Sequence, residues 1–118
     1  MAYASAVVLP VVDIVRAGVV TTTLPVTPTA THGNKMLNDG KTFIEVLNGS
    51  GAPIDVTIDA PGDVEGFAIT NLTVAVAAGV RKKIGPFTSI FNQADGYVWI
   101  VCSAVTTVTM GAFRTSNP

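Results

Sequence analysis

Hydrophobic and polar residues alternate along several short segments of the chain. The clearest case is 54–59, where isoleucine or valine alternates with aspartate or threonine. A period of two places successive side chains on opposite faces of a β-strand, so this segment predicts a strand with one buried face. Leu72, Val74 and Val76 repeat the pattern. Segment 42–47 is apolar on both faces apart from Glu45, which is typical of a central strand.

Turn residues separate these segments and suggest how they connect. Asn48-Gly49-Ser50-Gly51 predicts a tight turn, so we expect 41–48 and 53–59 to form a hairpin. Ala78-Gly79 leads into a strand over 80–84, which Gly85-Pro86 ends. The remaining expected elements are two paired strands, 97–103 and 106–113, and a possible helical turn at 89–94. Short strands at about ten-residue spacing predict an all-β fold, a β-sandwich or a small barrel, over residues 32–118.

Residues 1–31 follow a different pattern. They contain Pro10, Pro25 and Pro28, and their valines have no consistent period. Proline at these positions opposes both a long helix and a central strand. We therefore expect an extended N-terminal arm with short edge-strand pieces near 13–20 and 21–26. Because it is rich in valine, the arm should lie against its own domain or against a neighbouring subunit.

The amino-acid composition indicates which classes of partner the chain can have. Hydrophobic residues make up 48% of the 118 residues and charged residues only 13%, which is too apolar for a disordered chain. So little charge suggests a surface partly covered by other subunits, although a monomer coated with Thr and Ser would have the same composition. The net charge of −1 argues against nucleic acid as a partner. The apolar N-terminus lacks a basic region and contains Asp13 and Arg16, so neither a signal peptide nor a membrane partner is expected.

Few residues offer catalytic chemistry. His32 is the only histidine, and Cys102, the only cysteine, shares a predicted strand face with Val98 and Ile100. We expect Cys102 to be a buried core thiol rather than a nucleophile. Glu45, in an apolar setting, should sit at a strand edge or pair with a lysine. The acidic cluster Asp55, Asp59, Asp63 and Glu65 could hold calcium, but a solvated acidic face explains it more simply. No enzyme activity, metal or cofactor is predicted.

One basic cluster, Arg81-Lys82-Lys83, lies on the predicted strand 80–84. Alternation places Lys82 on the opposite face from Arg81 and Lys83. Charge of this kind protects an edge strand from unwanted pairing, and it could also contact an acidic neighbour. Gly49-Ser50-Gly51 lacks the third glycine and the helix of a phosphate-binding loop.

Several turns and strand ends have distinctive sequences, namely Gly33-Asn34-Lys35, Asn38-Asp39-Gly40-Lys41-Thr42-Phe43, Val46-Leu47-Asn48-Gly49-Ser50-Gly51, Ile84-Gly85-Pro86-Phe87 and Phe91-Asn92-Gln93-Ala94-Asp95-Gly96. These stretches resemble those of the head decoration, or cement, proteins of tailed bacteriophages. The similarity extends over residues 13–113. It implies a sandwich or jelly-roll fold and trimers or other homo-oligomers on the outer capsid surface of a virion, where they bridge subunits of the major capsid protein.

The resemblance and the arm together predict a structural virion protein that decorates and stabilises a capsid. An arm that adds a strand to a neighbour's sheet would satisfy its backbone hydrogen bonds there. The residues expected to make protein contacts are Val11, Val12, Ile14, Val15, Val19, Val20, Leu24, Arg81 and Lys83. A tail, neck or fibre-associated protein of the same particle is the alternative. A small carbohydrate-binding sandwich would need an aromatic platform, for which only Phe87, Phe91 and Tyr97 are available if Trp99 is in the core.

Overall fold

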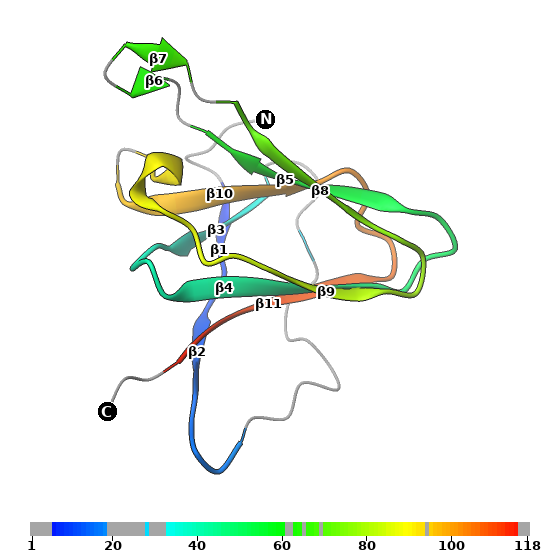
Figure 1. The fold of residues 1–118 in the computed structure, drawn as a ribbon. Coiled ribbons are helices and arrows are strands. Elements are labelled where there is room, and N and C mark those ends of the chain that lie inside the picture. Colours follow the sequence, from blue (N-terminus) through cyan, green and yellow to red (C-terminus); the bar gives the residue numbers. More distant parts are fainter. Residues whose placement is uncertain are drawn as a thin grey trace.

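A computed structural model describes residues 6–18, 28, 33–60, 63–64, 66–68, 70–93 and 95–115, with the backbone alone at 63, 64, 68 and 115. These residues form a β-sandwich, which confirms the predicted all-β fold (Figure 1). One sheet has five strands in the order β1-β3-β10-β5-β8, and the other has four in the order β2-β11-β4-β9. A separate hairpin pairs β6 with β7.

The strands of the five-stranded sheet are β1 (Val7–Val8), β3 (Asn34–Leu37), β10 (Tyr97–Cys102), β5 (Ile54–Asp59) and β8 (Leu72–Val76). Those of the four-stranded sheet are β2 (Val11–Ile14), β11 (Val108–Thr115), β4 (Thr42–Asn48) and β9 (Arg81–Ile84). The projecting hairpin consists of β6 (Asp63–Val64) and β7 (Phe67–Ala68). The 3-10 turn η2 (Ser89–Phe91) lies where the sequence predicts a helical turn.

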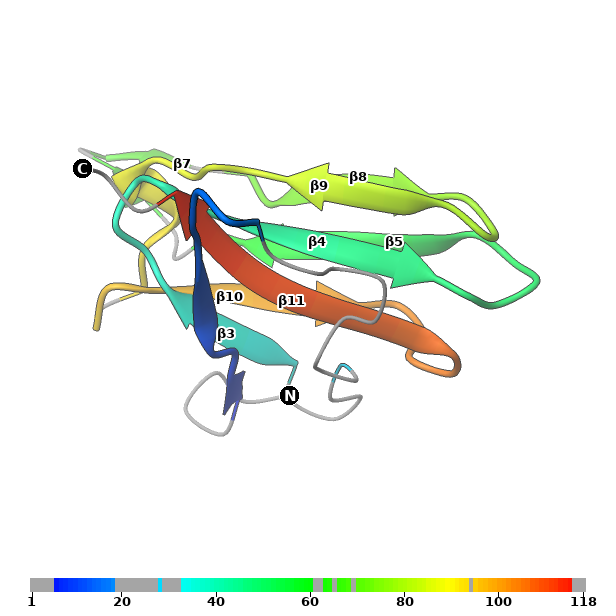
Figure 2. The ribbon, with the colours of Figure 1, turned by 90° about the horizontal axis from the view of Figure 1, so that it is seen from below.

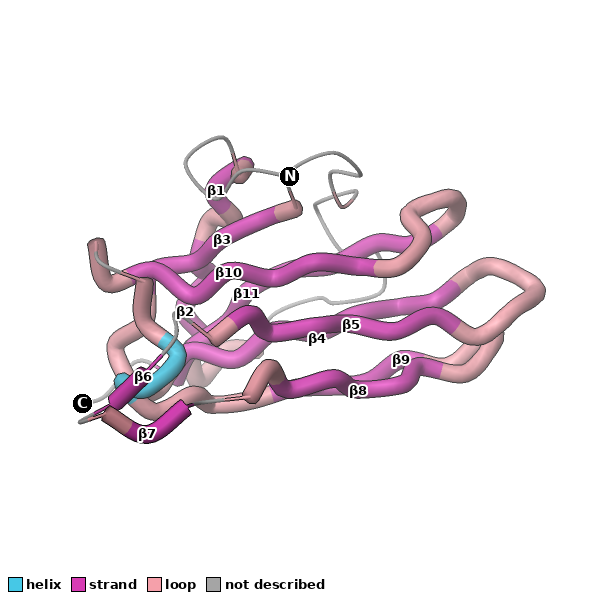
Figure 3. The backbone as a smooth tube through the Cα atoms, turned by 90° about the horizontal axis from the view of Figure 1, so that it is seen from above, coloured by secondary structure: helices cyan, strands magenta, loops and turns pink. Residues whose placement is uncertain are grey.

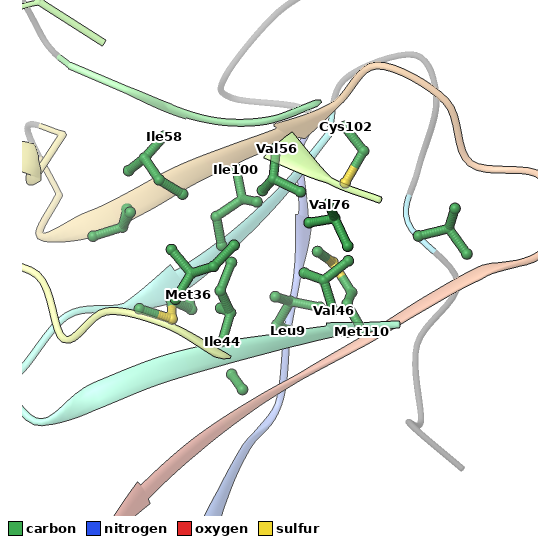
Figure 4. Packing of buried hydrophobic residues seen from close by; sticks show 14 of the residues in the cluster. Leu9, Met36, Ile44, Val46, Val56, Ile58, Val76, Ile100, Cys102 and Met110 are labelled. Carbon is green, nitrogen blue, oxygen red and sulfur yellow. The ribbon is translucent and has the colours of Figure 1, made fainter. Parts of the chain in front are cut away.

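Alternating apolar side chains from the two sheets meet in one core (Figure 4). Val56 and Ile58 of β5 are fully buried, whereas Asp55 between β5's apolar positions is exposed. Ile44 and Val46 of β4 face them from the other sheet and are equally buried. Each fully buried valine or isoleucine contributes roughly 1.5–3 kcal/mol relative to an exposed one, so these alternating positions hold the two layers together.

The predicted hairpin of 41–48 with 53–59 is wrong. β4 pairs with β11 and β9, while β5 pairs with β10 and β8 in the opposite sheet. The chain therefore arches from one sheet to the other at residues 49–53 (Figure 3). The fully buried Asn48 explains the arch, because its amide nitrogen donates to the carbonyl oxygens of Ala52 and Val76. These side-chain bonds replace the cross-strand ladder that a hairpin would form.

The predicted pairing of 97–103 with 106–113 is wrong for the same reason. β10 and β11 lie in opposite sheets, joined by an arch at residues 103–107. Another arch, at 77–80, joins β8 to β9, which lie in opposite sheets at the same side of the sandwich (Figures 1 and 2). Strands β4, β5, β8, β9, β10 and β11 lie where they were expected, but their three consecutive pairs connect the sheets instead of pairing within one. Strands β1, β3, β6 and β7 were not predicted.

The N-terminal segment contributes an edge strand to each sheet. β1 runs parallel to β3, and β2 runs parallel to β11. Between them, Leu9 is only 1% exposed and lies in the core (Figure 4). Residues 6–14 of the expected arm thus lie against the chain's own domain, and the observed strand is Val11–Ile14 rather than 13–20. The strand expected at 21–26 and the boundary between 31 and 32 lie outside the described residues.

Candidate functional site

One end of the sandwich displays large apolar side chains. We call it the loop end, because residues 38–41, 60–71 and 85–96 connect strands there (Figures 1 and 3). Phe67 on the hairpin is 75% exposed, Leu37 at the end of β3 is 50% exposed, and Ile90 in η2 is 38% exposed. Exposed large apolar side chains at one end of a domain can mark a contact with a partner, so this end is the candidate binding surface.

Side-chain hydrogen bonds tie the loops of this end to one another. The Asn38 amide nitrogen donates to Asn92 Oδ1 at 2.6 Å and to the Thr88 carbonyl oxygen at 3.3 Å. The Gln93 amide donates to the carbonyl oxygen of Asp59 at 3.1 Å. Below η2, Phe87 is buried and packs edge-on against Phe91 with ring centroids 6.0 Å apart. Leu37 and Ile90 are therefore presented by loops that are already fixed.

An exposed ion-pair group lies beside these loops. The Arg114 guanidinium contacts Asp13 at 2.5 Å and Asp39 at 3.2 Å. Asp39 also accepts from the backbone N–H of Lys41 at 2.9 Å and from the Thr42 hydroxyl at 2.8 Å. The Lys41 hydrogen bond, helped by those of Thr42 and Arg114, holds the pKa of Asp39 below its usual range. This group fixes the β3–β4 turn and connects β2 to the loop end.

Two of the predicted contact residues, Arg81 and Lys83, bind an acid of their own chain. Glu45 of the central strand β4 is only 1% exposed, and its carboxylate contacts Arg81 Nη1 at 2.7 Å and Lys83 Nζ at 2.8 Å. Burial by itself raises the pKa of Glu45, but the hydrogen bonds from Lys83 and Arg81 outweigh it, so the pKa is lowered. The prediction that Glu45 pairs with a lysine is confirmed.

The other predicted contact residues lie at the opposite edge of the same sheet. Val11, Val12 and Ile14 are half-buried on β2 beside β11, and Val15 just after it is 50% exposed. Two strands separate β2 from β9, so the valines and the basic residues do not form one surface. Val19, Val20 and Leu24 lie outside the described residues.

The expectation that Trp99 is a core residue is wrong. Its neighbours Val98 and Ile100 point into the core, so Trp99 and Tyr97 lie on the outer face of the five-stranded sheet, where both are half-buried. The Lys35 ammonium lies 5.3 Å from the centre of the Tyr97 ring. Because Phe87 belongs to the core, the three aromatics considered as a sugar platform do not share a face.

The remaining candidates offer little reactivity. Cys102 is buried beside Val56, and this burial raises the pKa of its thiol to about 11. Asp55 and Asp59 point away from the core, as expected of a solvated acidic face. Among the described residues, no three side chains of the metal-binding types come together, and the side chains of His32, Asp63 and Glu65 lie outside them.

Sequence reasoning missed Phe67, the most exposed large apolar side chain among the described residues. A usable signal is Gly66, which has a φ of 83° and closes the turn that pairs Val64 with Phe67. The alternation of polar and apolar residues does not predict the exposure of Phe67, because β6 and β7 contain only two residues each.

Comparison with known proteins does not extend this description. In the part of the chain that the structure describes, no helix is long and apolar enough to cross a membrane. No protein family model, no curated protein and no solved structure matches the chain.

Proposed function

We propose that this chain is a structural virion protein that decorates and stabilises a bacteriophage capsid by binding across subunits of the major capsid protein. The observation that carries the proposal is Phe67, 75% exposed on a hairpin outside both sheets. The resemblance of the turns to those of head decoration proteins supports the same function. The proposal includes homo-oligomers on the outer capsid surface and no catalytic step or cofactor.

An exposed aromatic side chain on a projecting hairpin is suited to anchoring a protein contact. Aromatic residues that enter a pocket on the partner often supply most of the binding free energy of an interface. The loops beside the hairpin are tied by Asn38 and Gln93, so they lose little conformational entropy when a partner binds. The loop end thus combines exposed apolar area with fixed geometry.

The contact should be apolar rather than electrostatic. Arg81 and Lys83 are engaged with Glu45, and the net charge of the chain is −1. Salt screens interactions between exposed charges, but it weakens apolar contacts little. We therefore expect binding to capsids to change little between low and moderate salt.

Phe67→Ser tests the anchor directly. Particles assembled without this protein are mixed with it, and occupancy and resistance to heat are measured. Burying a phenylalanine contributes roughly 2 kcal/mol, so the variant should bind at least about tenfold more weakly. Val80→Ser is the matched control, because Val80 is 39% exposed at the opposite end of the sandwich. Equal occupancy by Phe67→Ser and the unaltered protein would contradict the proposal.

The predicted role of the N-terminal segment needs a separate variant. Deleting residues 1–24 would remove Leu9 from the core and an edge strand from each sheet, so weaker binding could reflect unfolding. Val15→Ser leaves these intact and should weaken binding if the segment contacts the capsid. Electron microscopy of the decorated particles then distinguishes the sites. Density on capsomers supports the proposal, whereas density only at one vertex or on the tail supports the alternative.

A further inference from the structure

The edge strand β8 differs from the edge strands β2 and β9 in having no charge. Residues 70–80 contain no ionisable side chain, and β8 itself reads Leu-Thr-Val-Ala-Val. Among the described edge strands of more than two residues, β2 contains Asp13 and β9 contains three basic residues. Uncharged edge strands of high β-propensity readily pair with strands of other chains.

The register shows which backbone groups of β8 are free to pair. Asp55 of β5 donates its N–H to Ser103 Oγ and accepts from the Ser103 N–H, so its backbone groups point away from β8. Ala75, opposite Asp55, therefore directs its own N–H and C=O to the open edge. Thr73 lies two residues earlier and does the same. Both residues are exposed.

Lys82 occupies this edge from the other sheet. It lies opposite Val46, on the side of β9 that faces the five-stranded sheet, and its ammonium donates to the Ala75 carbonyl oxygen at 2.9 Å. Its neighbours Arg81 and Lys83 bind Glu45 on the outer face instead. Of the three basic residues of β9, only Lys82 thus donates to a backbone carbonyl oxygen of β8.

We propose that the open edge of β8 is a strand-pairing surface for a second copy of this chain, and that Lys82 keeps it closed. Two β8 strands related by a two-fold axis would pair antiparallel with Thr73 opposite Ala75 of the other copy. Each Ala75 carbonyl oxygen would then accept from a Thr73 N–H, and this is the oxygen that Lys82 occupies. Pairing would also bring two Lys82 ammonium groups together and remove them from water, which opposes it. The inference does not depend on the proposed function.

Lys82→Met tests the inference, because it keeps most of the apolar stem and removes the ammonium group. Sedimentation equilibrium over a range of concentrations should show self-association at least tenfold tighter than that of the unaltered protein. Lys83→Met is the matched control, since it removes the same charge from the same strand but on the outer face. It should associate like the unaltered protein. Equal behaviour of the two variants would overturn the inference.

A second substitution added to Lys82→Met tests whether the added self-association uses the edge of β8. Ala75→Pro removes an N–H that points to the open edge, so it should abolish the added association without breaking the ladder to β5. Thr73→Lys restores a charge to the same edge and should have the same effect. If neither substitution returns the association to the level of the unaltered protein, the added contact lies elsewhere and the proposed surface is wrong.

Discussion

The two ends of the sandwich are closed in different ways. At the arch end, where 49–53, 77–80 and 103–107 cross between the sheets, backbone contacts join the three arches (Figure 3). Asn48 N–H donates to the Val80 carbonyl, the Gly79 N–H donates back to Asn48, and the Gly49 N–H donates to Thr107. At the loop end, the Asn38 N–H donates to the Gly96 carbonyl oxygen, and the side chains of Asn38 and Gln93 add further ties. Phe67, the most exposed large apolar side chain among the described residues, also lies there.

Close packing restricts the sequence at the arch end. A Cβ at Gly49 would come within 2.6 Å of the Thr107 carbonyl oxygen, so the first and third arches are in backbone contact. The three arches contain no ionisable residue. The loop end has Asp39, Lys41 and Asp95 in its turns and keeps its exposed apolar side chains outside the core. The arch end therefore tolerates little change in its backbone contacts, whereas the loop end carries exposed side chains that the core does not need.

The largest expected effect is the loss of stability in Asn48→Ala. The side chain donates to Ala52 and Val76 and accepts from the backbone N–H and hydroxyl of Ser50. Its removal takes a donor from the buried Val76 carbonyl oxygen and the acceptor from the Ser50 N–H, and it leaves a cavity in the buried arch. The loss should be about 3 kcal/mol of unfolding free energy. Urea denaturation followed by circular dichroism measures this loss.

Asn38→Ala is the matching change at the loop end. Asn38 also makes several hydrogen bonds, but water can replace them at this more open site. We expect a loss of only about 1 kcal/mol. Similar losses in the two variants would show that the arch end does not hold the fold more strongly than the loop end.

The positions of the longer strands from β4 onward could be predicted from the sequence, but several of their partners and the short strands β1, β3, β6 and β7 could not. Segments 54–59 and 72–76 are strands as expected, because alternation directly reflects which side chains are buried. A hairpin and an arch both join two alternating strands through a short turn. The difference depends on where Asn48 finds its hydrogen-bond acceptors, and Val76 is 28 residues away.

Part of the candidate site could be predicted from the sequence. The alternation that correctly buries Cys102 with Val98 and Ile100 also places Trp99 on the opposite face, so its outward position followed from the same pattern. The exposure of Phe67 did not follow, because a two-residue strand has too few positions to define a face. The hydrogen bond from Lys82 to Ala75 forms because β8 and β9, in different sheets, lie at the same side of the sandwich. No local sequence pattern predicts how two sheets are placed relative to each other.

A smaller effect, with the opposite sign, is expected at Thr107. This residue has a φ of 57° in the third arch, a conformation that β-branched side chains adopt with strain. Asn tolerates the left-handed region better, so Thr107→Asn should raise the unfolding free energy by about 1 kcal/mol. Thermal unfolding would detect the change. A destabilised variant would mean that the Thr107 side chain contributes more than its backbone conformation costs.

The smallest expected effect is a loss of stability in acid that is confined to the loop end. The pKa of Asp39 is lowered in the folded chain, mainly by the hydrogen bond from Lys41, so its contribution to stability is complete above its ordinary value of about 3.8. As the pH falls through the lower folded value, Asp39 binds a proton and this contribution is lost. Hydrogen exchange should then show weaker protection of the Lys41 amide, while Gly49 and Gly79 in the arches remain protected.

Asp39→Asn keeps an oxygen acceptor for the Lys41 N–H but cannot titrate in this range. In that variant the protection of the Lys41 amide should no longer depend on pH between about 5 and 2, apart from the intrinsic exchange rate. Protection of Gly49 and Gly79 should match that of the unaltered chain, because no ionisable group lies in the arches. If the arch amides lose protection at the same pH as Lys41, acid opens the sandwich as one unit. The two ends would then differ in construction without differing in stability.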